Sequence, residues 1–205
     1  MVIGIDFDNT IVCYDDVFYS AAVERGLIPP EAGRGKSDVR NYLRAVGKED
    51  AWTELQGVIY GPEMKRARPF PGVKDFMARC AVRNIEFFII SHRTRHPYIG
   101  PRHDLHSAAR DWLRENGFSG RSPDLLDDEH IFFELKAEEK IARIASAGCT
   151  HFIDDLPEFL DRDDFPDGVE KILFDPSNLY ERTTNLKSIG SWAEMAETIF
   201  GGAAT

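Results

Sequence analysis

The sequence has few cysteines, no long apolar run and no excess of positive charge. Its three cysteines, Cys13, Cys80 and Cys149, are far apart and form no Cys-x-x-Cys pair, so we expect neither a disulfide framework nor a zinc site. Reduced thiols are typical of a cytoplasmic protein. The opening MVIGIDFDNT lacks the regions of a signal peptide, and no apolar run approaches the roughly 18 residues that span a bilayer. We therefore expect a cytoplasmic protein without a membrane partner.

The charge balance is acidic. The 205 residues include 25 Lys and Arg against 35 Asp and Glu, a formal net charge of −10 at pH 7. Proteins that bind nucleic-acid polymers neutralise phosphates with positive surface, so we expect no such partner. Hydrophobic residues make up 42% of the chain, as in ordinary globular proteins, and the length fits one domain with a small insertion.

Short runs of β-branched and aromatic residues alternate with helical patterns. Capping residues Ser191 and Glu194 also predict the start of a last helix. Alternating strands and helices are typical of a parallel sheet covered on both faces, so the expected fold class is α/β with a Rossmann-like sheet. The predicted strands are residues 2–7, 85–90, 130–133, 150–153 and 171–174.

Residues 14–68 interrupt this alternation, because they contain helical patterns and no convincing strand. Pro69 and Pro71 follow as turn signals. We interpret the stretch as a small helical cap inserted into an α/β core formed by residues 1–13 and 69–205. The helical patterns in the cap lie at residues 17–24, 39–46 and 51–59.

Two aspartates, Asp6 and Asp8, directly follow the first predicted strand. In open parallel sheets, ligands bind beyond the carboxyl ends of the strands. Two neighbouring carboxylates repel each other unless a cation joins them or one is protonated, and Mg²⁺ is a hard cation that prefers oxygen ligands. Taken alone, the pair is a weak signal, because acidic pairs at strand ends are common in ordinary surface turns.

The ends of other strands also carry polar residues. The second strand ends at Ser91, Lys136 stands shortly after the third, and the fourth ends at Asp154 and Asp155. At one edge of a sheet, this set would provide donors for a phosphoryl group and ligands for a metal ion. The sequence therefore predicts a site at that edge.

In these residues the chain resembles the haloacid dehalogenase (HAD) superfamily of phosphohydrolases. The motifs occur in the family's order, and the first and fourth are the specific ones. The predicted helical cap also stands where C1-type caps are inserted in that family. The matching residues are Asp6, Asp8 and Thr10 in the first motif, Ser91 in the second, Lys136 in preference to Lys140 in the third, and Asp154 with Asp155 in the fourth.

The resemblance implies catalytic roles for four residues. Asp6 is expected to be the nucleophile that forms an aspartyl-phosphate, and Asp8 the general acid and base. Ser91 is expected to hydrogen-bond a phosphoryl oxygen, and Lys136 to offset negative charge at the nucleophile.

The resemblance also implies a Mg²⁺ cofactor. Its expected ligands are the Asp6 and Asp154 side chains and the Asp8 backbone carbonyl. Asp155 is expected to be a further ligand or an outer acceptor, with a role as a helix N-cap as the alternative.

Two basic stretches stand out in this acidic chain. Arginine suits anion recognition because it forms bidentate contacts, so we expect a small phosphorylated substrate with more negative charge than one phosphate; solvated surface is the alternative. The expected substrate contacts are Thr10, His92, Arg93 and Arg95. The first basic stretch contains Arg34, Lys36, Arg40, Arg44 and Lys48 against Asp38 alone, and the second contains Arg93, Arg95 and Arg102.

The expected function is that of a Mg²⁺-dependent phosphomonoesterase for a small metabolite, either a sugar phosphate or a nucleotide. Asp8 argues against the dehalogenase branch of the family, which lacks this second aspartate. Phe7 argues against the transport ATPases, which carry lysine after the nucleophile. Two alternatives stay open: phosphoryl transfer to an acceptor other than water, and a catalytically silent HAD domain used for binding or assembly.

Overall fold

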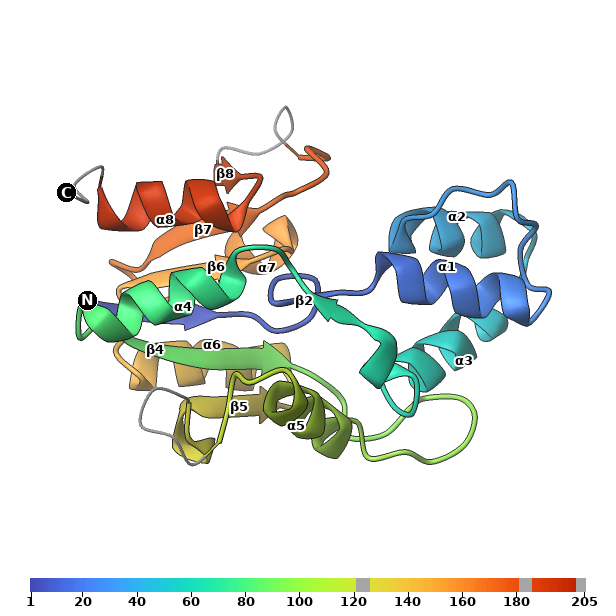
Figure 1. Cartoon of the computed structure of the whole chain (residues 1–205), viewed down its shortest axis with the longest axis horizontal. Coiled ribbons are helices and arrows are strands. Elements are labelled where there is room, and N and C mark those ends of the chain that lie inside the picture. The colour runs from blue at the N-terminus through green and yellow to red at the C-terminus, as the bar shows by residue number, and fades with distance from the viewer. Residues whose placement is uncertain (121–125, 181–185, 202–205) are drawn as a thin grey trace. The chain divides into compact units, whose positions relative to one another are not determined.

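The computed structural model describes residues 1–120, 126–180 and 186–201 (Figure 1). The chain divides into two compact units, which we call the sheet unit and the helical unit. The sheet unit comprises Met1–Val12, Pro69–His92 and Phe118–Thr205, and the helical unit comprises Cys13–Arg68 and Arg93–Gly117.

The sheet unit contains a six-stranded parallel sheet in the order β5-β4-β1-β6-β7-β8. This is the predicted α/β, Rossmann-like fold, and the five predicted strands are confirmed. The short edge strand β8 was not predicted. The strands are β1 (Val2–Ile5), β4 (Glu86–His92), β5 (Ile131–Glu134), β6 (His151–Asp154), β7 (Glu170–Phe174) and β8 (Lys187–Ile189).

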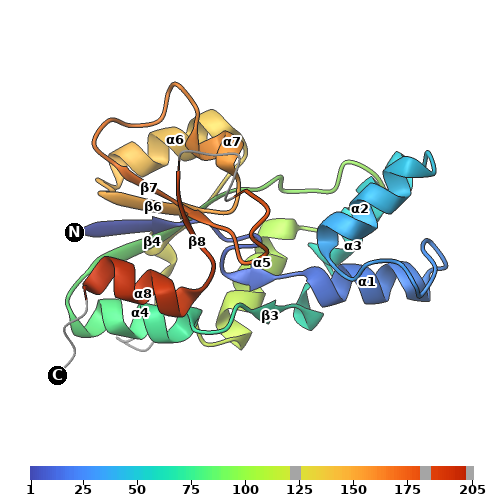
Figure 2. The ribbon, with the colours of Figure 1, turned by 90° about the horizontal axis from the view of Figure 1, so that it is seen from above.

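Helices cover both faces of this sheet, with α4 and α8 on one face and α6 and α7 on the other (Figure 2). The central strands are buried between them, and Ile3 and Ile5 have no exposed surface. Gly4 permits a close approach there, because a Cβ at this position would lie 2.4 Å from the Phe152 ring. The helices are α4 (Val73–Val82), α6 (Ala137–Ser146), α7 (Pro157–Leu160) and α8 (Trp192–Phe200), with the 3₁₀ turn η2 (Asp128–His130) before β5.

The predicted start of α8 is confirmed, with Ser191 as the N-cap, although Glu194 reaches back to Gly190 and not to Ser191 as in a standard capping box. The Ser191 hydroxyl accepts a hydrogen bond from the Glu194 N–H at 3.2 Å, and the Glu194 carboxylate accepts one from the Gly190 N–H at 3.1 Å. The first bond satisfies a backbone donor that the first helical turn leaves without a partner, and the second satisfies the donor just before the N-cap.

The helical unit is built around α1, α2 and α3, which correspond to the three predicted helical patterns. Its core includes Phe18 and Trp52, whose ring centroids lie 4.9 Å apart. None of the helices in the described ranges is long and apolar enough to cross a bilayer. The helices are α1 (Asp15–Glu24), α2 (Lys36–Ala45), α3 (Glu49–Ile59), η1 (Met64–Arg66) and α5 (Leu105–Glu115). Strands β2 (Val12–Cys13) and β3 (Arg68–Pro69) form a separate two-stranded sheet.

The segment 93–117 lies with the helical unit, whereas the sequence assigned it to the core. The Trp112 indole donates a hydrogen bond to the Ala67 carbonyl at 2.9 Å. Close packing also links the segment to α3, since a Cβ on Gly57 would lie 2.7 Å from Pro97. These contacts join residues about 40 positions apart, and local periodicity does not reveal such pairings.

Candidate active site

The loop after β1 carries the first two aspartates. The Asp6 N–H donates to the Ile153 carbonyl at 2.8 Å, so Asp6 continues the pairing of β1 with β6. The chain then turns through Asn9, whose φ of 57° is left-handed, a conformation that asparagine tolerates better than most residues. Asp6 is buried and Asp8 half-buried. The turn therefore brings both carboxyl-bearing residues to the carboxyl edge of the sheet.

A buried lysine joins the first and fourth motifs. The Lys140 ammonium lies 2.6 Å from Asp6 Oδ1 and 2.6 Å from Asp154 Oδ2. The side chains of Lys140, Asp6 and Asp154 are 3%, 7% and 0% exposed. Buried charges are stable only when they are paired and hydrogen-bonded, so each of these groups depends on the others.

The structure corrects the predicted third-motif lysine from Lys136 to Lys140. Lys136 is exposed and forms the N-cap of α6. Lys140 lies one turn further along, on the buried side of α6 with Ile141 and Ile144. Its place on that side of the helix directs its side chain towards the sheet.

Burial and mutual charge set the protonation of this group. Burial raises the pKa of Asp6 to about 7; Lys140 opposes this shift, whereas Asp154 and Asp8 add to it. Burial alone would lower the pKa of Lys140, but the carboxylates of Asp154 and Asp6 more than offset it and raise the pKa. Lys140 therefore stays positively charged at neutral pH, and further positive charge nearby would favour the ionised form of Asp6.

Asp6, Asp154 and Asp155 form a candidate cation site. One carboxylate oxygen from each lies within 4.8 Å of the others. Three ionised carboxylates beside one ammonium carry an excess of two negative charges, which fits a divalent cation, and their oxygen donors suit Mg²⁺. The Asp8 side chain is outside this group. The Leu156 N–H also donates to Asp154 Oδ1 at 3.0 Å, which fixes that carboxylate.

The structure gives the other predicted site residues different environments. Ser91 is buried at the end of β4, beside β1. His92 is exposed, and its Nε2 donates to the Leu135 carbonyl at 3.1 Å. Thr10 is fully buried, and its hydroxyl has no hydrogen-bond partner among the described residues. Because Thr10 is buried, we interpret it as a residue that holds the loop in place. The predicted contact between Thr10 and the substrate is less compatible with this burial.

The sequence predicts that Arg93 contacts the substrate, but the structure places its side chain in a buried position. It is 4% exposed, and its guanidinium donates to the carbonyls of Tyr60 at 2.8 Å and Leu105 at 3.2 Å. The guanidinium carbon also lies 5.0 Å from the Tyr60 ring centroid. These contacts give Arg93 a structural role within the helical unit.

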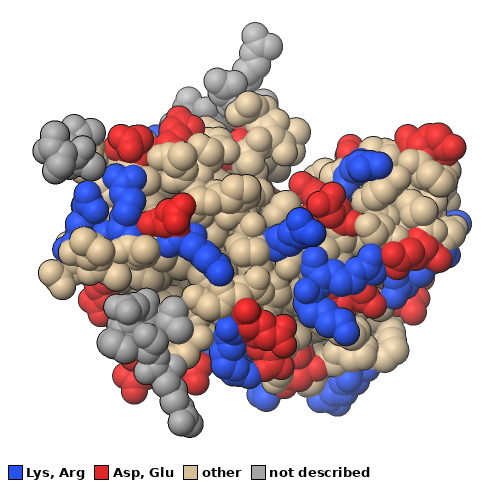
Figure 3. Space-filling view, viewed as in Figure 1, with Lys and Arg blue, Asp and Glu red and all other residues tan. Residues whose placement is uncertain are grey.

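The basic stretches are partly neutralised by neighbouring acids. Arg95 is exposed and pairs with Asp104 at 3.1 Å, so its contact with substrate stays a prediction. Arg44 forms a two-bond pair with Glu49 at 2.8 and 2.9 Å. Basic and acidic side chains are interspersed on the face drawn in Figure 3. Arg44 is therefore unsuited to the anion recognition that we considered for the first basic stretch.

Sequence analysis did not identify Trp192 as a residue that supports the site. Its indole N–H donates to the Thr10 carbonyl at 3.1 Å from the buried side. The ring is held between Phe76 and Phe174, with centroid distances of 4.9 and 5.4 Å. Trp192 therefore anchors the end of the loop that begins at Asp6.

We expect Trp192→Phe to weaken this anchor, with a loss of about 1–3 kcal/mol in unfolding free energy because a buried carbonyl loses its donor. Trp112→Phe is the matched control, since it removes the buried Trp112–Ala67 hydrogen bond in the helical unit. Denaturant unfolding should show similar losses of stability for both variants. If the protein has the expected phosphatase activity, only Trp192→Phe should lower kcat for the hydrolysis of p-nitrophenyl phosphate, by severalfold. Equal kcat values would contradict a role for Trp192 in loop placement.

Comparisons with known proteins agree with this fold. No protein-family model matches the chain. A Bacillus cereus protein named "putative nucleotidase" is 25% identical over 154 residues, which cover 72% of this chain and 68% of that protein. A haloacid dehalogenase-like protein of unknown function from Agrobacterium tumefaciens has a TM-score of 0.57 at 16% identity, with 97% of each chain covered. A magnesium-bound structure of a "putative HAD-hydrolase" from Bacillus subtilis has a TM-score of 0.56 at 10% identity, covering 97% of this chain and 98% of that chain.

These similarities establish the fold. The chain has the Rossmann-like fold of the HAD-superfamily hydrolases, as its motifs predicted. The residues that match the first and fourth motifs, Asp6 and Asp154, lie together at the carboxyl edge of its sheet.

Proposed function

We propose that this protein is a Mg²⁺-dependent phosphomonoesterase that hydrolyses a small phosphorylated metabolite. The observation that carries the proposal is the buried Asp6–Lys140–Asp154 arrangement, with Asp155 beside it, at the carboxyl edge of the sheet. It combines a nucleophile, a fixed positive charge and a set of oxygen ligands. Phosphoryl transfer depends mainly on such positioning and charge stabilisation.

The proposed reaction has two steps. First, an Asp6 carboxylate oxygen bonds to phosphorus while the ester P–O bond breaks, and Asp8 gives a proton to the leaving oxygen. Water then attacks the aspartyl-phosphate, Asp8 takes a proton from it, and inorganic phosphate leaves as Asp6 is regenerated. Burial and the neighbouring carboxylates favour the protonated form of Asp6, which is a poor nucleophile. Nearby positive charge is therefore needed to keep Asp6 ionised and reactive.

The remaining residues assist by charge and hydrogen bonding. Lys140 keeps Asp6 oriented and offsets its charge, and Ser91 is proposed to donate to a phosphoryl oxygen. A cation held by Asp6, Asp154 and Asp155 would neutralise charge on the phosphoryl group. We further propose a nucleoside monophosphate as the first substrate class to test, because the Bacillus cereus relative carries a nucleotidase name.

We expect phosphate release to require Mg²⁺. EDTA should abolish the hydrolysis of p-nitrophenyl phosphate and of a nucleoside monophosphate, and excess Mg²⁺ should restore it. Ca²⁺ should support little activity, because its longer and more variable coordination distances misplace reacting groups. Full turnover in EDTA, or no phosphate release from a broad panel of phosphate esters with Mg²⁺, would contradict the proposal.

Asp8→Asn should separate the proposed proton transfer from the rest of the reaction. General acid–base catalysis contributes about 10²–10⁴-fold, and good leaving groups need little protonation. The variant should therefore lose far more activity on an alkyl phosphate than on p-nitrophenyl phosphate, measured as kcat/KM in parallel. Equal losses on both esters would argue against Asp8 as the acid.

A further inference from the structure

The Lys140 ammonium has an aromatic neighbour as well as its two carboxylates. Its nitrogen lies 4.1 Å from the centroid of the Phe159 ring and 5.3 Å from that of Phe152. A cation within about 6 Å of a ring centroid is attracted by the ring's electron-rich face, most strongly when both are removed from water. Lys140 and Phe159 are both buried. The ammonium is therefore held by negative charge and by an aromatic face together.

The chain places Phe159 there through the turn that follows Asp154. The Leu156 N–H donates to Asp154 Oδ1 at 3.0 Å, and the Phe159 N–H donates to the Leu156 carbonyl at 3.1 Å. This turn opens the short helix α7, which carries Phe159. One local structure thus fixes both a carboxylate partner and the aromatic partner of Lys140.

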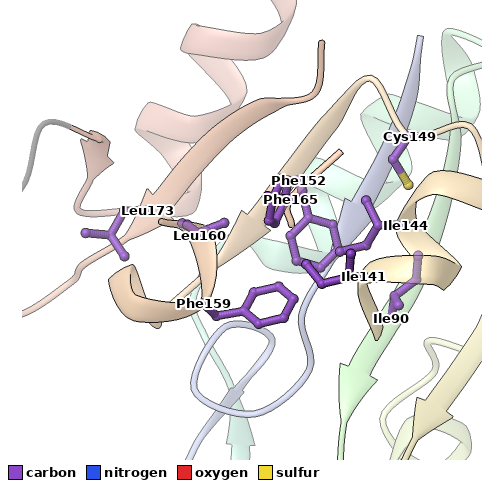
Figure 4. Close-up of a cluster of buried hydrophobic side chains, with 9 residues drawn as sticks. All are labelled: Ile90, Ile141, Ile144, Cys149, Phe152, Phe159, Leu160, Phe165 and Leu173. Atoms are coloured by element: carbon purple, nitrogen blue, oxygen red, sulfur yellow. The ribbon is translucent and has the colours of Figure 1, made fainter. Parts of the chain in front are cut away.

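The Phe159 ring is itself held in a hydrophobic cluster. Figure 4 shows it beside α6, with other aromatic and aliphatic side chains around it. Its centroid lies 6.0 Å from that of Phe152 and 5.8 Å from that of Phe165. Close packing of this kind restricts the movement of a side chain. The ring is therefore a fixed surface against which the flexible lysine is held.

We propose that Phe159 is a positioning residue whose ring holds the Lys140 ammonium between Asp6 and Asp154. Lysine is a flexible side chain that ends in a compact charge, and two carboxylates alone would let it move to either one. The Phe159 ring limits this movement and excludes water from the side of the ammonium that faces neither carboxylate. The consequence for catalysis rests on the proposed function, in which Lys140 orients Asp6.

Phe165 offers a matched control within the same cluster. Phe159 and Phe165 are equally buried, each with 7% exposed surface. The cation that lies over Phe165 is Lys171, 4.7 Å from its centroid. Replacing either ring with leucine removes similar packing, but only Phe159→Leu removes the contact with Lys140.

The kinetic test compares Phe159→Leu, Phe165→Leu and Phe159→Tyr. We expect both leucine variants to be destabilised to a similar extent. Only Phe159→Leu should lower kcat, by about tenfold, with little change in KM because Lys140 acts on the nucleophile. Phe159→Tyr keeps the ring and should retain most of kcat. Equal kcat losses in the two leucine variants, or a folded tyrosine variant as slow as Phe159→Leu, would overturn the proposal.

A second test needs no enzymatic activity. Denaturant unfolding of Phe159→Leu, Lys140→Met and the double variant measures the coupling of the two side chains. We expect coupling of about fivefold or more in the unfolding equilibrium constant, and none between Phe165 and Lys140. No coupling at Phe159 would overturn the positioning role. An inactive wild-type protein that still shows the coupling would contradict the phosphatase proposal and leave the positioning of Lys140 supported.

Discussion

Replacing Asp6 with asparagine is expected to abolish phosphate release while the protein stays folded. An amide is a poor nucleophile and a poor ligand for a hard cation. Loss of an attacking group from a cooperative site removes nearly all of its catalysis, so we expect kcat to fall by at least about 10³-fold. The measurement is phosphate release from p-nitrophenyl phosphate with saturating Mg²⁺.

The structure explains why this variant should fold. Asp6 is buried, and its raised pKa shows that its charge is disfavoured there. Asparagine has nearly the same shape, and its carbonyl oxygen can still accept a hydrogen bond from Lys140. The melting temperature should therefore change by only a few degrees, so lost activity reports on chemistry rather than on unfolding. A folded Asp6→Asn protein that keeps more than about 1% of wild-type kcat would contradict the covalent mechanism.

The sheet and the edge that carries the candidate site are predictable because both depend on local patterns. The runs that form β1, β4, β5, β6 and β7 are short and apolar, and parallel pairing brings their carboxyl ends to one edge. Strand β8 is harder to predict, because Lys187–Ile189 has three residues and only one of them is apolar. The grouping of residues 93–117 with the helical unit depends on distant contacts such as Trp112–Ala67.

The choice between Lys136 and Lys140 depends on which of them lies on the buried face of α6. The sequence favours Lys136 as the lysine shortly after the third predicted strand. Lys140, however, precedes Ile144 by four residues, and residues four apart share one face of a helix. That signal is present in the sequence, because Ile141 and Ile144 already mark the buried face. The burial of Arg93 has no comparable signal, since its carbonyl partner Tyr60 lies 33 positions away.

Removing the charge of Lys140 is expected to affect both stability and catalysis. Lys140→Met leaves Asp6 and Asp154 buried without the cation that they share. Breaking a buried ion pair by removing one partner costs about 3–5 kcal/mol. Burial raises the pKa of Asp6 to about 7 in the wild type, although Lys140 lowers it, so without Lys140 this pKa should rise further and the folded variant should hold the proton to higher pH than the folded wild type. The stability of the variant relative to wild type should therefore fall further as the pH rises above about 7, as denaturant unfolding on both sides of that pH would measure.

The same substitution at Lys136 is the control. Lys136 is exposed at the start of α6, and a surface change of this kind usually alters stability by less than about 0.5 kcal/mol. Lys136→Met should therefore keep both its stability and its kcat, whereas Lys140→Met should lose at least about 10²-fold in kcat with saturating Mg²⁺. The two variants have the same composition and differ only in whether the charge is lost from the exposed N-cap or from the buried side of α6. If Lys136→Met lost the activity and Lys140→Met kept it, Lys136 would be the third-motif lysine after all, and the buried ion pair would serve stability alone.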